Sequence, residues 1–353
     1  NFIHPITFET LTGHKTLIDS FDRNFNYNIE HVSLAKKADI VLVAPATANV
    51  IGKIVSGIAD DMLTTTVLAC KCKKLIAPAM NTQMYENPIV QDNLKKLIQY
   101  DMTVITPEVG LLACKDVGAG KLPSEQTLMD YILREIRFEK DLAGKRIVVT
   151  AGPTRESIDP VRFISNHSTG KMGYAIARAA MERGADVTLV SGPVSLTPPP
   201  FVKVIDVVSA ADMFEAVKEA GKDADIIIKA AAVADYTPEI IAEEKMKKQD
   251  SDSSIALKRT TDILKWMGEH RKPGQFLCGF SMETEHLLDN SKAKLEKKNL
   301  DMIVANSLRV EGAGFGVDTN VVTILTKDSV TELPQMSKDA VAGKILDAIS
   351  DRL

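Results

Sequence analysis

Three groups of residues in the second half of the sequence have the capacity for nucleotide chemistry. The segment ISNHSTGKMG at 164–173 places glycine and hydroxyl residues where a helix is expected to begin. Backbone N–H groups at a helix start bind anions, because they have no partner within the helix and the helix dipole adds a positive potential. The run EKMKK at 244–248, and Lys294 with Lys298 one helical turn away, add positive charge. These residues indicate a phosphate site, and the competing interpretation of both lysine groups is a solvated charge run.

The two common nucleotide fingerprints are absent. The Thr-Gly-Lys at 169–171 lacks the upstream glycine spacing of a P-loop, and no Gly-x-Gly-x-x-Gly follows an expected strand. A nicotinamide dehydrogenase is therefore disfavoured.

The first half carries three segments that follow expected strands. They are APATAN at 44–49, APAMNTQMY at 77–85 and the glycine-rich GLLACKDVGAG at 110–120. Ligands of open α/β sheets bind at the carboxyl ends of strands, and a cysteine on a mobile loop can donate a proton or act as a nucleophile. Taken singly, Asn81 could be only a helix cap, Cys114 a small buried apolar residue, and His31 a structural histidine.

Short apolar strands alternate with helices along the whole chain, which is typical of parallel sheets covered on both faces. In the first half we expect strands at 39–44, 74–79 and 102–106, with helices at 49–69, 88–99 and 126–140. In the second half we expect strands at 146–150, 186–190, 202–207, 225–228, 276–280, 302–305 and 321–325, with helices at 171–183, 210–220, 262–270, 285–298 and 337–351. The predicted fold class is α/β, with two doubly wound parallel-sheet domains (Rossmann-like or flavodoxin-like) in tandem, at 1–140 and 141–353.

Bulk properties exclude several classes of protein. The chain has 353 residues, 45% hydrophobic and 25% charged, which suffices for two globular cores. A net charge of −4 does not indicate the basic surface that binds nucleic acid. No apolar run is long enough to span a membrane. The four cysteines do not form paired metal-binding motifs, and their scarcity fits a reducing, cytoplasmic location. Residues 1–28 are polar rather than strand-like, so we expect the sequence to begin in the middle of a domain.

The first half resembles a known family. The strings HVSLAKKADIVLVAPATAN (31–49), SGIADDMLTTTVLA (56–69) and PAMNTQMY (78–85) are similar to flavin-containing cysteine decarboxylases, in particular phosphopantothenoylcysteine decarboxylases. The resemblance implies an FMN cofactor. It implies as well that the first strand and the phosphate loop of this family would precede residue 1, so the first domain, 1–140, is expected to be incomplete. It also implies that His31 lies beside the flavin, that Asn81 holds the substrate carboxylate, and that the flap residue Cys114 donates a proton as the intermediate is reduced. A β-thiol acid has no adjacent electron sink, and the flavin would supply one.

The second half resembles another family. The strings TAGPTRESIDPVRFISNHSTGKMG (150–173), AAVADY (231–236), EKMKKQ (244–249) and KNLDMIVAN (298–306) are similar to CTP-using bacterial phosphopantothenate–cysteine ligases. The implied substrates are 4'-phosphopantothenate, cysteine and CTP. The acid attacks the α-phosphate of CTP, and the amine of cysteine then displaces CMP from the acyl-cytidylate. Lysines and Mg²⁺ would offset the negative charge that gathers in the first step, although the sequence identifies no metal ligands.

Site residues of the ligase half follow from the same resemblance. Asn166 is expected to contact the acyl-cytidylate, and Lys245 to be needed when cysteine attacks. The residues expected to hold CTP are Lys229, Ala230, Ala231, Asp235, Thr260, Thr261, Asp262, Ile263, Phe280, Lys294 and Lys298. Lys229 and Thr261 depart from the family pattern, in which a small or neutral residue and a proline are common there.

The resemblance further implies assembly into homo-oligomers, with trimers of the flavin domain and dimers of the ligase domain. In relatives the flavin pocket lies between subunits. The main alternative is a non-catalytic, flavin-fold regulatory protein, against which the joint presence of His31, Asn81 and Cys114 argues.

Overall fold

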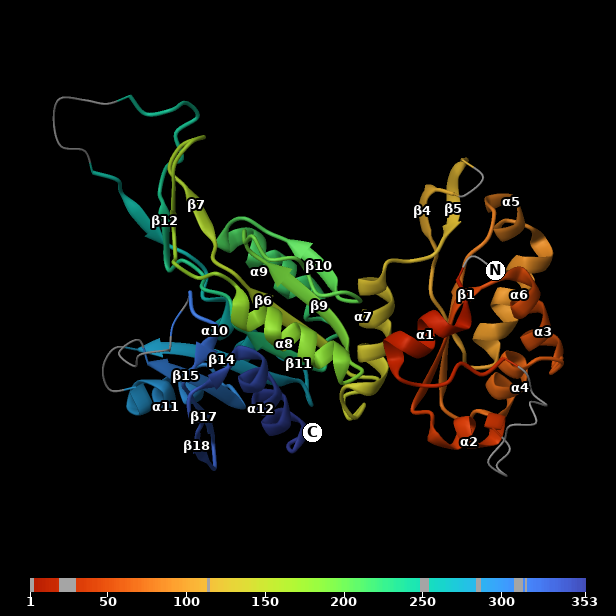
Figure 1. The fold of residues 1–353 in the computed structure, drawn as a ribbon. Helices are drawn as coiled ribbons and strands as arrows, with labels where there is room; N and C mark the ends of the chain where they lie inside the picture. The colour runs from red at the N-terminus through yellow and green to blue at the C-terminus, as the bar shows by residue number, and fades with distance from the viewer. Residues whose placement is uncertain are drawn as a thin grey trace. The chain divides into compact units, whose positions relative to one another are not determined.

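The computed structural model describes residues 3–18, 30–112, 115–247, 254–283, 287–307, 314 and 316–353. The chain forms two compact units, Asn1–Phe138 and Glu139–Leu353 (Figure 1). The sequence places the boundary after residue 140, whereas the packing of the structure divides the chain after Phe138. Each unit is described by itself.

The first unit is built around a parallel sheet in the order β1-β2-β3. Helices α3 and α6 pack together, and their apolar residues join those of β1 and β2 in one core. Its elements are α1 (Pro5–Thr12), α2 (Glu30–Lys37), β1 (Ile40–Ala46), α3 (Ala48–Ser56), α4 (Met62–Ala69), β2 (Lys73–Pro78), α5 (Thr82–Tyr85), α6 (Pro88–Gln99), β3 (Thr103–Val104), β4 (Glu108–Leu111), β5 (Val117–Lys121) and α7 (Glu125–Ile136).

The single helix expected at 49–69 is wrong, because the structure has two helices there. Helix α3 ends at Gly57, which adopts a left-handed φ of 70°, a conformation that glycine reaches without a steric penalty. Asp61 then caps α4 by accepting the backbone N–H of Thr64. A glycine cap followed by an aspartate cap ends one helix and starts the next.

The second unit contains an eight-stranded sheet in the order β10-β9-β6-β11-β14-β15-β17-β18. Strands β10 to β15 are parallel, which confirms the predicted fold class. Its elements are β6 (Arg146–Ala151), β7 (Arg155–Ser157), β8 (Phe163–Ser165), α8 (Lys171–Glu182), β9 (Asp186–Ser191), β10 (Lys203–Asp206), α9 (Ala210–Ala220), β11 (Ile226–Lys229), β12 (Tyr236–Pro238), β13 (Leu257–Arg259), α10 (Ile263–His270), β14 (Phe276–Glu283), α11 (Leu287–Lys297), β15 (Met302–Ser307), β16 (Thr319–Asn320), β17 (Val322–Thr326), β18 (Val330–Glu332), β19 (Met336–Ser337) and α12 (Lys338–Ser350).

One edge of this sheet departs from the expected parallel pattern. Strand β17 runs antiparallel to β15, and β18 runs antiparallel to β17. A short turn at 327–329 joins β17 to β18, and a parallel return would need a crossover of about a dozen residues. The apolar run at 321–325 alone does not reveal strand direction.

Helices cover both faces of the sheet (Figure 1). Helices α8 and α12 pack against each other and share one core with the sheet, including Ile176 and Ile345. The opposite core takes residues from α9, α10 and α11, including Met213, Met267 and Leu295. The strand ends between these two layers carry the residues discussed below.

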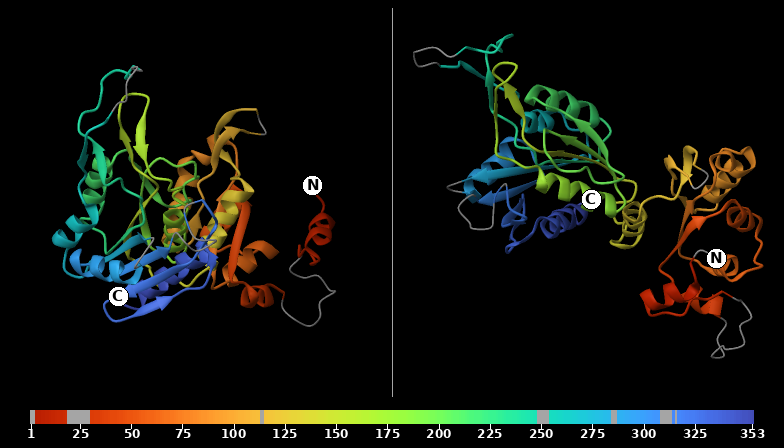
Figure 2. Two further views of the ribbon diagram at one scale, coloured as in Figure 1. Left: turned by 90° about the vertical axis from the view of Figure 1, so that its left-hand side faces the viewer. Right: turned by 45° about the horizontal axis from the view of Figure 1, so that its top comes forward.

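An arm projects from the sheet of the second unit, as the two further views make clear (Figure 2). It consists of the antiparallel pairs β7–β8 and β12–β13, which contact each other through β12 and β7. Val161, Phe163 and Ile240 on this arm are exposed, Ile240 to 83%. The arm therefore presents apolar side chains to its surroundings.

Gly173 allows α8 to lie directly against β6. A Cβ at this position would lie 2.6 Å from Ala151 Cβ and 2.9 Å from the Thr150 carbonyl oxygen. We expect Gly173→Ala to lower the free energy of unfolding by about 1–3 kcal/mol, because the overpacking outweighs the higher helix propensity of alanine. Gly343 in α12 is the matched control, since nothing lies within 4 Å of its Cβ position. Urea unfolding should show Gly343→Ala to be stabilising, and equal stabilisation by Gly173→Ala would contradict the packing argument.

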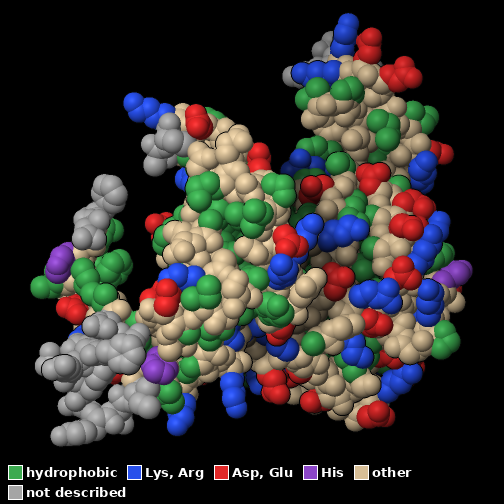
Figure 3. Space-filling view, turned by 90° about the vertical axis from the view of Figure 1, so that its right-hand side faces the viewer, with side chains coloured by type: hydrophobic (Ala, Val, Ile, Leu, Met, Phe, Trp, Pro, Cys, Tyr) green, Lys and Arg blue, Asp and Glu red, His purple; other side chains and the backbone are tan. Residues whose placement is uncertain are grey.

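Charged side chains of both signs are interspersed on the face shown in Figure 3. This distribution agrees with the small net charge. Among the described residues, no helix is both long and apolar enough to cross a bilayer.

Candidate functional site

Two adjoining cavities open at the carboxyl ends of the central strands of the second unit. The larger, here called the central cavity, has a volume of about 410 Å³ and lies where β6, β11 and β14 end. The smaller, here called the side cavity, has a volume of about 370 Å³. Lys229, Val233 and Asp235 line both cavities. The two cavities therefore share part of their lining.

Most of the residues expected to hold a nucleotide line these cavities. The central cavity takes Asn166, Lys229, Ala230, Ala231, Asp235 and Phe280. The side cavity takes Thr260, Thr261, Asp262, Ile263 and Lys298, together with Lys229 and Asp235. Lys294 lies next to the central cavity, because its Nζ is 3.4 Å from the hydroxyl of Ser281, a lining residue.

Hydrogen bonds hold the loops after β6 and β11 together. Thr150 Oγ1 accepts the N–H of Ala231, and Thr154 Oγ1 accepts the N–H of Ala234. Asn166 Nδ2 donates to the Ala232 carbonyl at 2.9 Å. The loop after β6 therefore fixes the position of the AAVADY segment, and Asn166 belongs to the same network.

The start of α8 faces the central cavity. Gly170 caps this helix with a φ of 80° and no side-chain hydrogen bond, and residues 168–173 line the cavity. The first N–H groups of a helix point outward with a positive potential. This confirms the expected helix start beside the glycine and hydroxyl residues.

An ion pair closes one wall of the side cavity. Lys298 Nζ lies 2.9 Å from Asp262 Oδ2, and Asp262 also accepts the N–H of Lys265 as the cap of α10. Burial opposes ionisation of Asp262, but the hydrogen bonds from Lys298 and Lys265 outweigh it, so the pKa of this carboxyl is lowered. Asp262 is therefore a fixed negative charge that holds Lys298 at the cavity.

Lys245 lies on the arm and does not line either cavity. Its side chain is exposed, and the neighbouring Met246 is held in place by its backbone. The Met246 N–H donates to Asp159 Oδ2 at 3.1 Å, and Arg162 Nη2 donates to the Met246 carbonyl at 2.9 Å. The structure therefore does not bring Lys245 and Asn166 into one cavity of the described residues.

Asp159 is a residue that the sequence interpretation missed. This buried carboxylate accepts the N–H groups of Val161 and Arg162, the Arg162 guanidinium, and the N–H of Met246. The Arg162 guanidinium and these backbone donors hold its pKa well below its usual range. The Asp-Pro pair at 159–160 is a turn signal, but no local signal shows that this turn fixes the segment containing Lys245.

Asn306 was also missed. It lies on β15, is 5% exposed, and lines the central cavity. Its Oδ1 is buried with no hydrogen-bond partner, which is costly unless a ligand or water supplies a donor. The orphaned oxygen marks the cavity as a place for a polar ligand.

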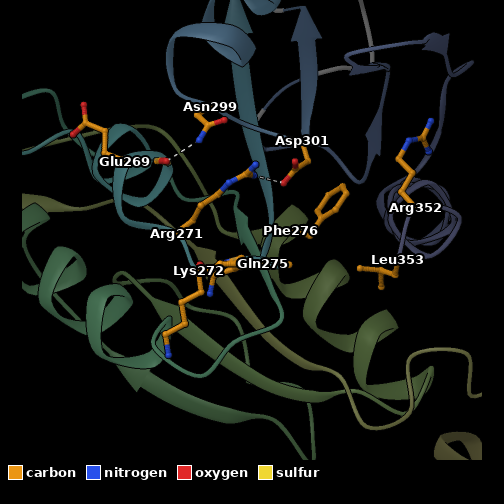
Figure 4. A pocket seen from close by; sticks show the side chains of 12 residues that line it. Glu269, Arg271, Lys272, Gln275, Phe276, Asn299, Asp301, Arg352 and Leu353 are labelled. Carbon is orange, nitrogen blue, oxygen red and sulfur yellow. Dashed lines mark hydrogen bonds and ion pairs between the residues drawn. The ribbon is translucent and has the colours of Figure 1, made fainter.

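A cavity of about 550 Å³ opens at the opposite edge of the same sheet (Figure 4). Phe276 begins β14 and Asp301 immediately precedes β15, so this cavity lies at the amino ends of the strands. The Arg271 guanidinium is paired with the Asp301 carboxylate at 2.6 Å. Ligands of open α/β sheets bind at the other edge, and we assign the chemistry to the central and side cavities despite their smaller size.

The first unit places its candidate residues on different elements. Asn81 follows β2 and caps α5 through its oxygen, which accepts the N–H of Gln83 at 2.9 Å. His31 lies half-buried in the first turn of α2, which packs against α4. Figure 1 shows α2 and α4 at the foot of this unit, with α5 and the β4–β5 hairpin at its top. The structure therefore does not bring His31 and Asn81 together within this unit.

Cys114 lies outside the described residues, but the hairpin that carries it is anchored beside Asn81. Strands β4 and β5 pair antiparallel on either side of residues 112–116. The Met80 N–H donates to the Gly120 carbonyl at 3.0 Å, and a Cβ on Gly120 would lie 2.2 Å from the Met80 carbonyl oxygen. Glycine thus permits the hairpin to sit against the loop that contains Asn81.

No cluster of three or more histidine, cysteine, aspartate or glutamate side chains suited to a metal ion occurs in the described part of the chain.

A doubly wound sheet with a helix start and two adjoining cavities at its strand ends is typical of nucleotide-binding α/β domains, and it is linked here to a smaller α/β unit. Residues 142–353 match the family model "DNA/pantothenate metabolism flavoprotein C-terminal domain", and residues 1–137 match the model "Flavoprotein". The chain belongs to the family of bifunctional coenzyme A biosynthesis proteins.

Three similar proteins illustrate this membership. The coenzyme A biosynthesis bifunctional protein CoaBC of Bacillus subtilis is 50% identical over 99% of this chain and 87% of its own length. A cysteine/cysteine sulfinic acid decarboxylase of an unknown prokaryotic organism is 44% identical over 98% of each chain. The crystal structure of the C-terminal domain of a CoaBC protein is 47% identical, with a TM-score of 0.52, over 60% of this chain and 97% of its own.

Proposed function

We propose that this chain carries out two steps of coenzyme A biosynthesis. The second unit condenses 4'-phosphopantothenate with cysteine at the expense of CTP, through an acyl-cytidylate. The first unit is an FMN-dependent decarboxylase that converts phosphopantothenoylcysteine to 4'-phosphopantetheine. Membership of the bifunctional family supports both activities, and no comparison supports the non-catalytic alternative.

One observation carries the ligase assignment. Residues from separate segments of the sequence, around 166, 229–235, 260–263, 280 and 298, line two cavities that share a wall. The start of α8 at the central cavity and Lys298 at the side cavity supply positive potential for phosphate groups, and Asn166 lines the central cavity. The acid would be activated by attack on the α-phosphate in this site, with pyrophosphate as the leaving group.

Mg²⁺ fits this site as an ion delivered with the nucleotide. The carboxylate of Asp235 lines both cavities, whereas the carboxylate of Asp262 is already paired with Lys298. Mg²⁺ is commonly held by one or two carboxylates together with substrate phosphates. We propose Asp235 as the protein's contribution to that ion.

The carboxyl ends of β1 and β2 fit part of an FMN site. Ala46 and Pro78 are paired in register, and the following residues supply small side chains, the Thr47 hydroxyl and the Asn81 amide. When bound, FMN supplies the two-electron acceptor that the decarboxylation needs. Asn81 would orient the substrate carboxylate through hydrogen bonds, and Cys114 would hold the proton delivered to the substrate carbon.

Oligomers follow from the same assignment. Helix α2, which contains His31, lies at the foot of the first unit, and α5, which Asn81 caps, lies at its top (Figure 1). A second copy that brings its His31 beside Asn81 would complete a flavin site. The apolar arm of the second unit, with Phe163, Ile240 and Ile241 exposed, would be covered by a second copy in a dimer. We propose trimers of the first unit and dimers of the second, in the cytoplasm.

Asp159 would position the segment that contains Lys245. We expect Asp159→Asn to slow amide formation roughly tenfold to a hundredfold, because a misplaced reactive group loses rate steeply, while CTP binding is retained. Limited trypsin digestion should cleave at 245–247 faster in this variant.

The Asp159 carboxylate is needed in its charged form. Its contacts with the Met246 segment should therefore persist above the ordinary aspartate pKa and be lost only as pH falls below that value. Asp206→Asn, an exposed position on β10, is the control, and an unchanged digestion pattern for Asp159→Asn would remove the positioning role.

A coupled assay tests the proposed function. Purified chain is given 4'-phosphopantothenate and cysteine with either CTP or ATP, and pyrophosphate release is measured alongside amide formation. Release that requires CTP and the acid supports the ligase. No release with CTP would overturn the ligase assignment. The first unit is tested with FMN and with either phosphopantothenoylcysteine or free cysteine, because one relative is named for cysteine.

A further inference from the structure

Lys229 occupies an unusual position in the nucleotide site. It ends β11, where its backbone pairs with Thr150 on one side and Gly279 on the other. Its side chain is half-buried and lines both the central and the side cavity. A long cationic side chain therefore contributes to the lining of both cavities.

The Lys229 ammonium makes no hydrogen bond or ion pair with the residues that the structure describes. The carboxylate of Asp262 already has two partners, because it pairs with Lys298 and accepts the N–H of Lys265. Lys298 repels Lys229, whereas Asp262 and Asp235 attract it weakly through space. A half-buried cation without a partner is costly, so this position calls for an anion that the protein itself does not supply.

We propose that the Lys229 ammonium binds a phosphate group of a nucleoside triphosphate that occupies both cavities. The inference rests on the proposed ligase function. It assigns to the side chain a role that the usual small residue at this position cannot have.

The titration of Lys229 gives the inference a distinctive signature. Burial, with repulsion by Lys298, lowers the pKa of Lys229 to about 8. A bound phosphate favours the charged form, so ligand binding should take up protons between this pKa and the ordinary lysine value. Raising the pH from 7 to 9 should then weaken binding about tenfold, since the protonated fraction of Lys229 falls by about that factor.

Other charged groups face the same space and must be separated from Lys229. Lys171 and Lys338 line the central cavity, and Arg259, Asp235 and Tyr236 line the side cavity. Burial lowers the pKa of Lys338 as well, yet its Nζ donates to the Gly314 and Val317 carbonyls. Substitution of Lys229 alone therefore isolates its contribution from theirs.

Calorimetry of the full chain with Mg²⁺ tests the inference, using CTP and, as a ligand without a base, pyrophosphate. Binding is measured at pH 7 and pH 9 for wild type, Lys229→Met, Lys229→Arg and the control Lys265→Met, an exposed lysine of α10 outside both cavities. At pH 7 we expect Lys229→Met to weaken both ligands on the order of ten- to a hundredfold, the usual loss for a charged hydrogen bond. At pH 9 we expect Lys229→Arg to bind more tightly than wild type, because arginine stays charged.

Each outcome decides the matter. A flat pH dependence in Lys229→Met, with rescue by arginine, supports the phosphate contact. Unchanged CTP affinity in Lys229→Met, a pH dependence that survives the substitution, or a loss confined to CTP with pyrophosphate unaffected overturns it. If wild type bound no CTP at all, the proposed ligase function would fail, which is distinguishable from failure of Lys229 alone.

Discussion

Lys245→Gln is expected to reduce amide formation on the order of 10²- to 10³-fold while the chain stays folded. Attack of the cysteine amine on the acyl-cytidylate builds negative charge on the carbonyl oxygen and on the departing phosphate. A cation aimed at such charge is typically worth this factor, and glutamine keeps most of the length but none of the charge. Folding should survive, because the Lys245 side chain is exposed and the local contacts are made by the Met246 backbone.

The measurement separates the two chemical steps. Pyrophosphate released in a single turnover reports formation of the acyl-cytidylate, and mass spectrometry of the products reports the amide. Lys247→Gln is the matched control, since Lys247 is equally exposed two residues away. Wild-type amide formation in Lys245→Gln would remove the assigned role.

Cys114→Ser is expected to block completion of decarboxylation at least about a hundredfold, the usual contribution of a positioned general acid. A serine hydroxyl is close to a thiol in size but gives up a proton far less readily. Strands β4 and β5 pair through residues 108–111 and 117–121, and the Met80 N–H donates to the Gly120 carbonyl, so the substitution should leave the hairpin in place. Carbon dioxide should still be released from phosphopantothenoylcysteine, while 4'-phosphopantetheine fails to accumulate.

Cys72→Ser serves as the control for this experiment, because Cys72 is a free, half-buried cysteine of the same unit outside the hairpin. The flavin absorbance of both variants checks that the cofactor is retained. A normal yield of 4'-phosphopantetheine from Cys114→Ser would contradict the proton-donor assignment.

The alternation of strands and helices was predictable from the sequence because burial on both faces of a parallel sheet requires continuous apolar strands. Helix limits were predictable wherever a cap residue is explicit, as at Ser209 before α9, where a capping box forms. The helix expected at 49–69 was wrong because the prediction left out two local signals, the glycine cap at Gly57 and the aspartate cap at Asp61. The direction of β17 was not predictable, because strand polarity depends on the connection and on the partner strand.

The sequence by itself determined the fold class and the motif residues, since periodicity, caps and strand-end loops are local properties of the chain. Only the tertiary structure decided which of these residues meet. In the structure Lys229 and Asp235 line two cavities, and the buried Oδ1 of Asn306 has no hydrogen-bond partner. Asp159 accepts the Met246 N–H and so holds the segment that contains Lys245. Such contacts connect residues far apart in the chain, and they exist only after the sheet has brought the ends of its strands to one edge.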